Sequence, residues 1–179
     1  MAQVDVPCAG PSGGIVVTVF QLDADGYVMQ PLDPRLCTIP LAQVSDRLPV
    51  ITGLNAYQLQ PGHRVESPQV QAALGLVGAF DHSPMTGLVD LRRINVASPG
   101  VIGVTTDQGG EITFGLDHLE QQLRRWREIY DLGQRMNKWV ASLNLAVSNN
   151  IPVRWMETGA IPSPLPGKIN PSMNRRKNV

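Results

Sequence analysis

The pattern of apolar and polar positions predicts strands at both ends of the chain. Residues 15–22 are β-branched and apolar, and they run into the turn Asp23-Ala24-Asp25-Gly26 and a second short strand, Tyr27-Val28-Met29. Near the other end, residues 139–147 alternate apolar and polar side chains, as in a strand with two different faces. After a turn at residues 148–150, Ile151-Pro152-Val153-Arg154-Trp155 predicts the final strand.

Two stretches between these strands have the spacing of helices. The first begins at Ser67-Pro68, with serine as the cap and proline at the first helical position, and ends near residue 81. The second runs from about Asp117, the expected cap, to Asn137. Each helix carries an apolar stripe with the i, i+3, i+4, i+7 spacing, which in the second is Leu119, Leu123, Trp126, Ile129 and Tyr130.

Four further strands are predicted between and before the helices, at residues 48–53, 88–96, 101–106 and 111–115. Gly109-Gly110 suits a tight hairpin, so the last two should pair antiparallel. The order of elements predicts an α+β domain, with a mostly antiparallel sheet and two packed helices, over residues 15–156. We expect residues 1–14 to be a loose N-terminal segment and the proline-rich, basic residues 157–179 to be a flexible tail.

Composition narrows the classes of function. Fifteen basic and fifteen acidic residues balance, and aromatic residues make up 5% of the 179, which argues against a nucleic-acid platform. Nucleic acid could then be bound only through the terminal Arg175-Arg176-Lys177, and this hypothesis predicts that binding depends strongly on salt. No apolar run reaches the roughly 18 residues of a membrane span, and the first residues lack a signal-peptide pattern.

Candidate catalytic side chains are few and scattered. His63, His82 and His118 have no metal-ligand spacing, and Cys37 lies in no recognisable nucleophile context. A small soluble hydrolase is the alternative function, and it would need two or more of these four side chains to meet in one pocket. Whether Cys8 and Cys37 form a disulfide stays open. We expect no enzyme activity, no cofactor and no metal.

Four segments, in this order, resemble the FtsQ/DivIB family of bacterial cell-division proteins. Residues 23–28 followed by Leu48-Pro49-Val50-Ile51-Thr52-Gly53 are similar to the family's "D-x-D-G-x-V … LPxLxG" stretch, and a helix then separates them from the central strands. Residues 110–126 resemble its strand that ends in a glycine and leads into a helix. Residues 143–155 resemble its terminal "V-D-L-R … V-x-W" strands, with Asn144, Ala146 and Val147 as departures.

This resemblance implies the extracytoplasmic β domain of that family, on the periplasmic face of the inner membrane. In such a protein a transmembrane helix and a POTRA domain precede the β domain. The resemblance also implies a non-enzymatic scaffold whose partners are the bitopic division proteins FtsB and FtsL. It places partner binding on the last strands and at the end of the long helix. The predicted site residues are Leu145, Val147, Asn149, Asn150, Ile151, Val153 and Trp155.

Overall fold

The computed structural model of the protein describes residues 1–9, 15–29 and 48–157. Their framework is one eight-stranded sheet with two α-helices and a short 3₁₀ helix. The strands are β1 (Ala2–Ala9), β2 (Ile15–Leu22), β3 (Val50–Thr52), β4 (Leu91–Asn95), β5 (Val101–Thr106), β6 (Glu111–Gly115), β7 (Lys138–Asn144) and β8 (Val153–Glu157). The helices are η1 (Ala56–Gln58), α2 (Pro68–Asp81) and α3 (Leu119–Arg135).

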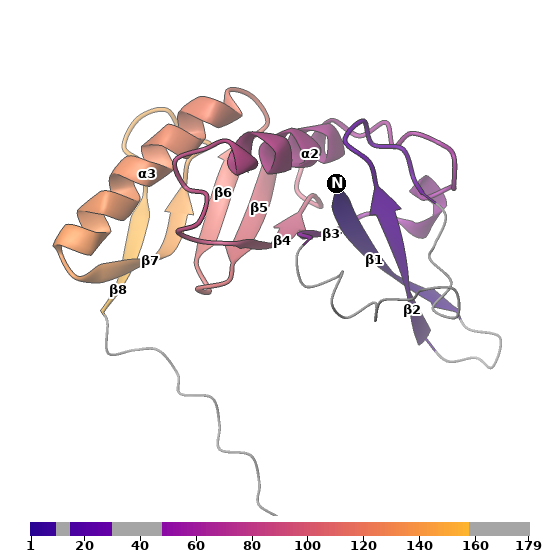
Figure 1. Ribbon diagram of the computed structural model, residues 1–179, viewed down its shortest axis with the longest axis horizontal. Helices are drawn as coiled ribbons and strands as arrows, with labels where there is room; N and C mark the ends of the chain where they lie inside the picture. Colours follow the sequence, from indigo (N-terminus) through magenta and orange to yellow (C-terminus); the bar gives the residue numbers. More distant parts are fainter. Residues whose placement is uncertain (10–14, 30–47, 158–179) are drawn as a thin grey trace, which may run out of the picture.

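The sheet has the strand order β2-β1-β3-β4-β5-β6-β7-β8, so β8 and β2 are its two edges (Figure 1). Four of the seven neighbouring pairs are antiparallel and three are parallel. Both helices cross the same face of the sheet, α2 over β5 and α3 over β6 and β7. The predicted α+β class with a mostly antiparallel sheet is therefore confirmed, as is the β5–β6 hairpin, in which Gly109 has a φ of 79°.

The expectation of a loose N-terminal segment was wrong for Ala2–Ala9. These residues form β1, which pairs antiparallel with β2 along its whole length and parallel with β3 at Gln3 and Val4. Ala2 and Val4 are fully buried. The alternation of Ala2, Val4 and Val6 with Gln3 and Asp5 was the sequence signal of this strand. Pro7 lies beyond the β3 pairing, where a missing N–H costs least.

The helix starts differ from the prediction in their capping. Ser67 precedes α2 as expected, but its hydroxyl donates to Gln69 Oε1 at 2.9 Å and not to the backbone of the first turn. At α3 the cap residue is His118, with φ 54°, and not Asp117. His118 provides its carbonyl oxygen to the N–H groups of Gln121 and Gln122, so the first turn closes through the backbone.

Trp126 is the centre of the core between helices and sheet. Its side chain is 2% exposed, and its ring lies 6.1 Å from that of Phe80 on α2 and 5.9 Å from that of Phe114 on β6. The α3 stripe is confirmed, because Leu123 is buried with Trp126 while Leu119, Ile129 and Tyr130 pack against the core. Three elements are thus joined through one indole ring.

Several expectations fall outside the described residues. They concern the tail predicted at 157–179, of which the structure describes only Glu157, as the last residue of β8. They also concern Cys37 and its disulfide with Cys8, and the basic cluster at Arg175, Arg176 and Lys177. Within the described residues, neither helix has the length and apolar character that would allow it to cross a bilayer.

Candidate protein-binding edge

Among the strands of the described residues, β8 is an edge of the sheet and pairs only with β7. The pairs run from Leu143↔Val153 to Lys138↔Glu157, with a bulge on β7 between Val140 and Ser142. A strand that has one neighbour presents its other row of N–H and C=O groups outward. The side of β8 away from β7 is therefore a template on which one more strand can be added.

One backbone hydrogen bond shows which β8 groups face outward. The N–H of Asn144 donates to the carbonyl oxygen of Pro152 at 3.1 Å, so residue 152 directs its backbone groups toward β7. Because these directions alternate along a strand, Val153, Trp155 and Glu157 direct their N–H and C=O groups outward. Pro152 has no N–H, and the place of that missing donor is on the β7 side. Proline therefore removes nothing from the free edge.

The side chains of β8 divide between the two faces of the sheet. Val153 is paired with the buried Leu143, and Trp155 with Val140, so both lie on the face that carries the helices. Arg154 and Met156 lie on the opposite, open face and are exposed. A strand added beside β8 would meet an apolar row under α3 and a charged, mixed row on the open face.

Gly133 determines how Trp155 lies against the end of α3. A Cβ atom added at this buried glycine would be 2.6 Å from Cζ3 of Trp155 and 2.8 Å from the carbonyl oxygen of Lys138. No side chain other than hydrogen fits in that space. The indole ring of Trp155 therefore covers the last turns of α3 and is half-buried, rather than projecting freely into solvent.

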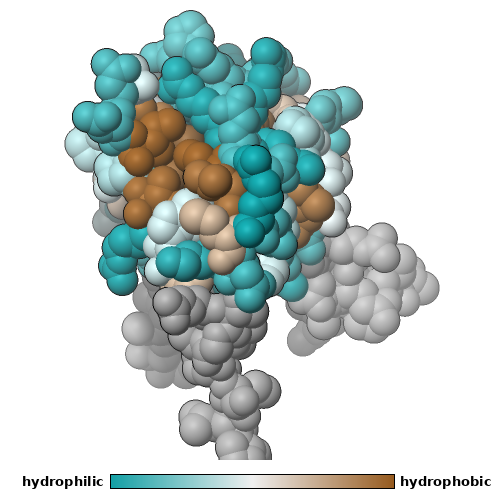
Figure 2. All heavy atoms as spheres, turned by 90° about the vertical axis from the view of Figure 1, so that its left-hand side faces the viewer, coloured by the Kyte–Doolittle hydropathy of each residue, from teal (hydrophilic) through white to brown (hydrophobic). Residues whose placement is uncertain are grey.

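The flank of α3 above β8 is apolar as well. Leu132 and Met136 are each 43% exposed, and Ile129, one turn before Leu132, is half-buried. Figure 2 looks onto this end of the molecule and shows apolar side chains gathered in its middle, framed by hydrophilic ones. We call this surface the edge groove; its residues are Ile129, Leu132, Met136, Ile151, Val153 and Trp155.

The structure brings together only part of the predicted site. Leu145 is 2% exposed and belongs to the core, and its N–H donates to the carbonyl oxygen of Thr113 at 2.7 Å. Val147, Asn149 and Asn150 are exposed in the β7–β8 connection, and Ile151, Val153 and Trp155 are half-buried along the edge. The resemblance implied contact at the end of the long helix as well, but the predicted site residues include none from α3. Leu132 and Met136, four residues apart and outside the main stripe, were the signal for it.

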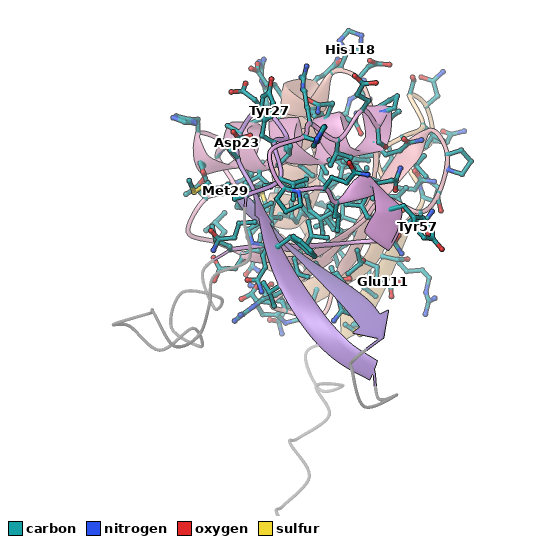
Figure 3. All side chains as sticks on the ribbon, turned by 90° about the vertical axis from the view of Figure 1, so that its right-hand side faces the viewer. Asp23, Tyr27, Met29, Tyr57, Glu111 and His118 are labelled. Carbon is teal, nitrogen blue, oxygen red and sulfur yellow. The ribbon has the colours of Figure 1, made fainter. Side chains whose placement is uncertain are left out.

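The three histidines of the hydrolase alternative lie on separate elements. His63, His82 and His118 are all exposed, in a loop, after α2 and before α3 respectively, and Figure 3 shows His118 at the outer surface. His82 Nδ1 lies 3.1 Å from the carbonyl oxygen of Gly78, within its own helix end. Within the residues the structure describes, no three His, Cys, Asp or Glu side chains are grouped as metal ligands.

Neither of two cavities near the helices brings two histidines together. A wide hollow of about 550 Å³ between α2 and α3 has His118 on its rim, and His118 is the one histidine that lines it. A cavity of about 20 Å³ lies under α3, beside Trp126 and Trp139, with room for about one water molecule. Neither places two candidate catalytic side chains at one point.

The carboxylate of Asp23 is used within its own turn. Its Oδ1 accepts hydrogen bonds from the N–H groups of Asp25, at 3.0 Å, and Tyr27, at 2.8 Å, and Gly26 follows the turn with a φ of 88°. Figure 3 shows Asp23 and Tyr27 near one another on the end of the molecule opposite the edge groove. This geometry accounts for the Asp-rich turn without a ligand.

We expect Asp23→Ala to lower the free energy of unfolding by about 1 kcal/mol, because two backbone donors lose their acceptor. Asp23→Asn should cost less, since the amide oxygen accepts the same bonds. Urea denaturation measures both. Asp25→Ala is the matched control in the same turn, and an equal loss in the Asp25 and Asp23 variants would contradict this role.

The chain matches no protein-family model and no curated protein sequence.

Proposed function

We propose that this chain is a non-enzymatic binding module of bacterial cell division, and that it holds an extended segment of a partner along β8. The proposed partners are the periplasmic segments of FtsB-type and FtsL-type division proteins, as the resemblance to the FtsQ/DivIB β domain implies. In the full-length protein the module would lie on the periplasmic face of the inner membrane. The observation that carries the proposal is the free backbone edge at Val153, Trp155 and Glu157, beside an apolar groove.

Backbone and side chains support this proposal together. The outward N–H and C=O groups supply hydrogen bonds to any strand, which gives affinity with little dependence on sequence. The edge groove adds apolar surface from Leu132 and Met136, whose exposed parts a bound segment would cover. Large apolar side chains gathered at one end of a domain are typical of a partner site.

The tests are substitutions at Val153, with affinity for the periplasmic FtsB-type and FtsL-type segments of the same organism measured by titration calorimetry. Val153→Pro removes one outward N–H, and Val153→Lys places a charge against the groove. We expect each to weaken binding about ten-fold, that is by about 1.4 kcal/mol, with the circular dichroism spectrum unchanged.

Val19→Lys is the matched control. Val19 is 37% exposed on β2, the opposite edge of the same sheet, so the new charge is equal but lies far from the groove. Its affinity for the same segments should equal that of the original chain. If both Val153 variants bind as tightly as the Val19 variant, or if neither segment binds the original chain at all, the proposal is wrong.

A further inference from the structure

The register of β7 and β8 indicates what sequence the bound segment carries. Paired residues in a sheet point to the same face, so an added strand would continue each row of β8. The rows of Val153 and Trp155 lie under the helices, and the row of Arg154 between them lies on the open face. The residue added opposite Arg154 therefore stands on the open face, between two residues that stand on the helix face.

The positive charge of Arg154 has no acidic cross-strand neighbour. Arg154 is paired with Ser142 on β7, and Ser142 is paired with Glu111 on β6. Glu111 therefore lies two strands away from Arg154 and is not its direct neighbour. Within the described residues the side chain of Arg154 makes no ion pair or hydrogen bond; the two ion pairs there both lie on α3. A carboxylate on an added strand would be its direct cross-strand neighbour.

The two rows on either side of Arg154 require apolar residues. An added side chain opposite Val153 or Trp155 would lie under the α3 flank formed by Ile129, Leu132 and Met136. A polar side chain at these positions would lose water without gaining a hydrogen-bond partner among them.

We propose that the β8 edge selects an extended peptide segment with the core pattern apolar–acidic–apolar, in which the acidic residue pairs with Arg154. This inference rests on the proposed function and adds the chemistry of the ligand. The pattern reads the same in both directions, so it holds for a parallel and for an antiparallel strand. The alternative is that Arg154 only repels incoming strands and keeps the edge unpaired, a role that charged residues have on many edge strands.

The test uses three synthetic pentapeptides with blocked ends and the full chain labelled with ¹⁵N. The peptides are threonine-valine-glutamate-valine-threonine, the same peptide with lysine in the middle, and the glutamate peptide with serine in place of both valines. Titration to millimolar concentration follows the amide signals of Val153, Trp155 and Glu157. We expect the glutamate–valine peptide to shift these signals and to bind about five-fold more tightly than the lysine peptide. The serine peptide should be weaker too.

Arg154→Glu is the decisive variant, because it leaves the backbone edge and the groove unchanged. It should reverse the preference, so that the lysine peptide binds more tightly. Equal binding of the glutamate and lysine peptides, or an unchanged preference in Arg154→Glu, overturns the pattern while leaving strand addition intact. If no peptide shifts the amide signals of the edge residues, the pattern is wrong. If, in addition, the Val153→Lys variant binds the FtsB-type and FtsL-type segments as tightly as the original chain does, the proposed function is wrong as well.

Discussion

Replacing Trp126 by alanine is expected to lower the free energy of unfolding by about 3–5 kcal/mol. The ring is 2% exposed and contacts Phe80 on α2 and Phe114 on β6, so its removal opens a cavity where both helices meet the sheet. Native domains are stable by only about 5–15 kcal/mol, so this loss is a large fraction of the total. Urea denaturation followed by far-ultraviolet circular dichroism measures it.

Tyr57→Ala is the control for this experiment. Tyr57 is also aromatic, but it is 86% exposed on η1, so its removal should change stability by no more than about 0.5 kcal/mol. Trp126→Phe keeps an aromatic ring in the same place and should lie between the two. A loss below about 1 kcal/mol in Trp126→Ala would mean that the two helices are held to the sheet by other contacts.

Gly133→Ala is expected to destabilise the protein by about 1–3 kcal/mol, although alanine favours helices. The added methyl group would lie 2.6 Å from the Trp155 ring and 2.8 Å from the Lys138 carbonyl oxygen, both well inside van der Waals contact. The ring must move outward, and it would then fill the edge groove. We therefore expect weaker binding of the proposed partners and a changed tryptophan fluorescence spectrum.

Gly78→Ala is the matched control, since this glycine lies on α2 with no atom within 4 Å of an added Cβ. It should stabilise the protein by about 0.5–1 kcal/mol. The double variant Gly133→Ala/Trp155→Ala separates the two contacts of the added methyl group. If the Trp155 ring carries the cost, the two substitutions are not additive; additive losses would assign the cost to the Lys138 carbonyl.

The elements with strong local patterns were predictable from the sequence. The α3 stripe, the β5–β6 hairpin and β2 follow from spacing that depends on neighbouring residues alone. β1 was missed because three reasons to doubt it coincided: its position at the start of the chain, Pro7 within it, and an alternation only a few residues long. Its place between β2 and β3 depends on pairing with Val50 and Ile51, which local patterns do not encode.

In the candidate site, too, local patterns were predictable and pairing between elements was not. The last strand and its apolar residues Ile151, Val153 and Trp155 were identified from alternation, but alternation does not say which residue pairs with which. Leu145 is a predicted partner-binding residue, and its side chain is buried on the same face as Leu143; the hydrogen bond from its N–H to the carbonyl oxygen of Thr113 continues the parallel β6–β7 pairing. The contact between Gly133 and Trp155 joins two elements through space, so neither residue signals it locally.

The three residues of β3 have a consequence for how the sheet opens. Val50–Thr52 is the whole connection within the sheet between the β1–β2 hairpin and the strands from β4 onward, with two residues paired on one side and three on the other. Strand pairing over so few residues opens at a lower free energy than the longer ladders beside it. Native-state hydrogen exchange should therefore find two cooperative units, with the hairpin exchanging first while β4–β8 and the partner edge stay closed.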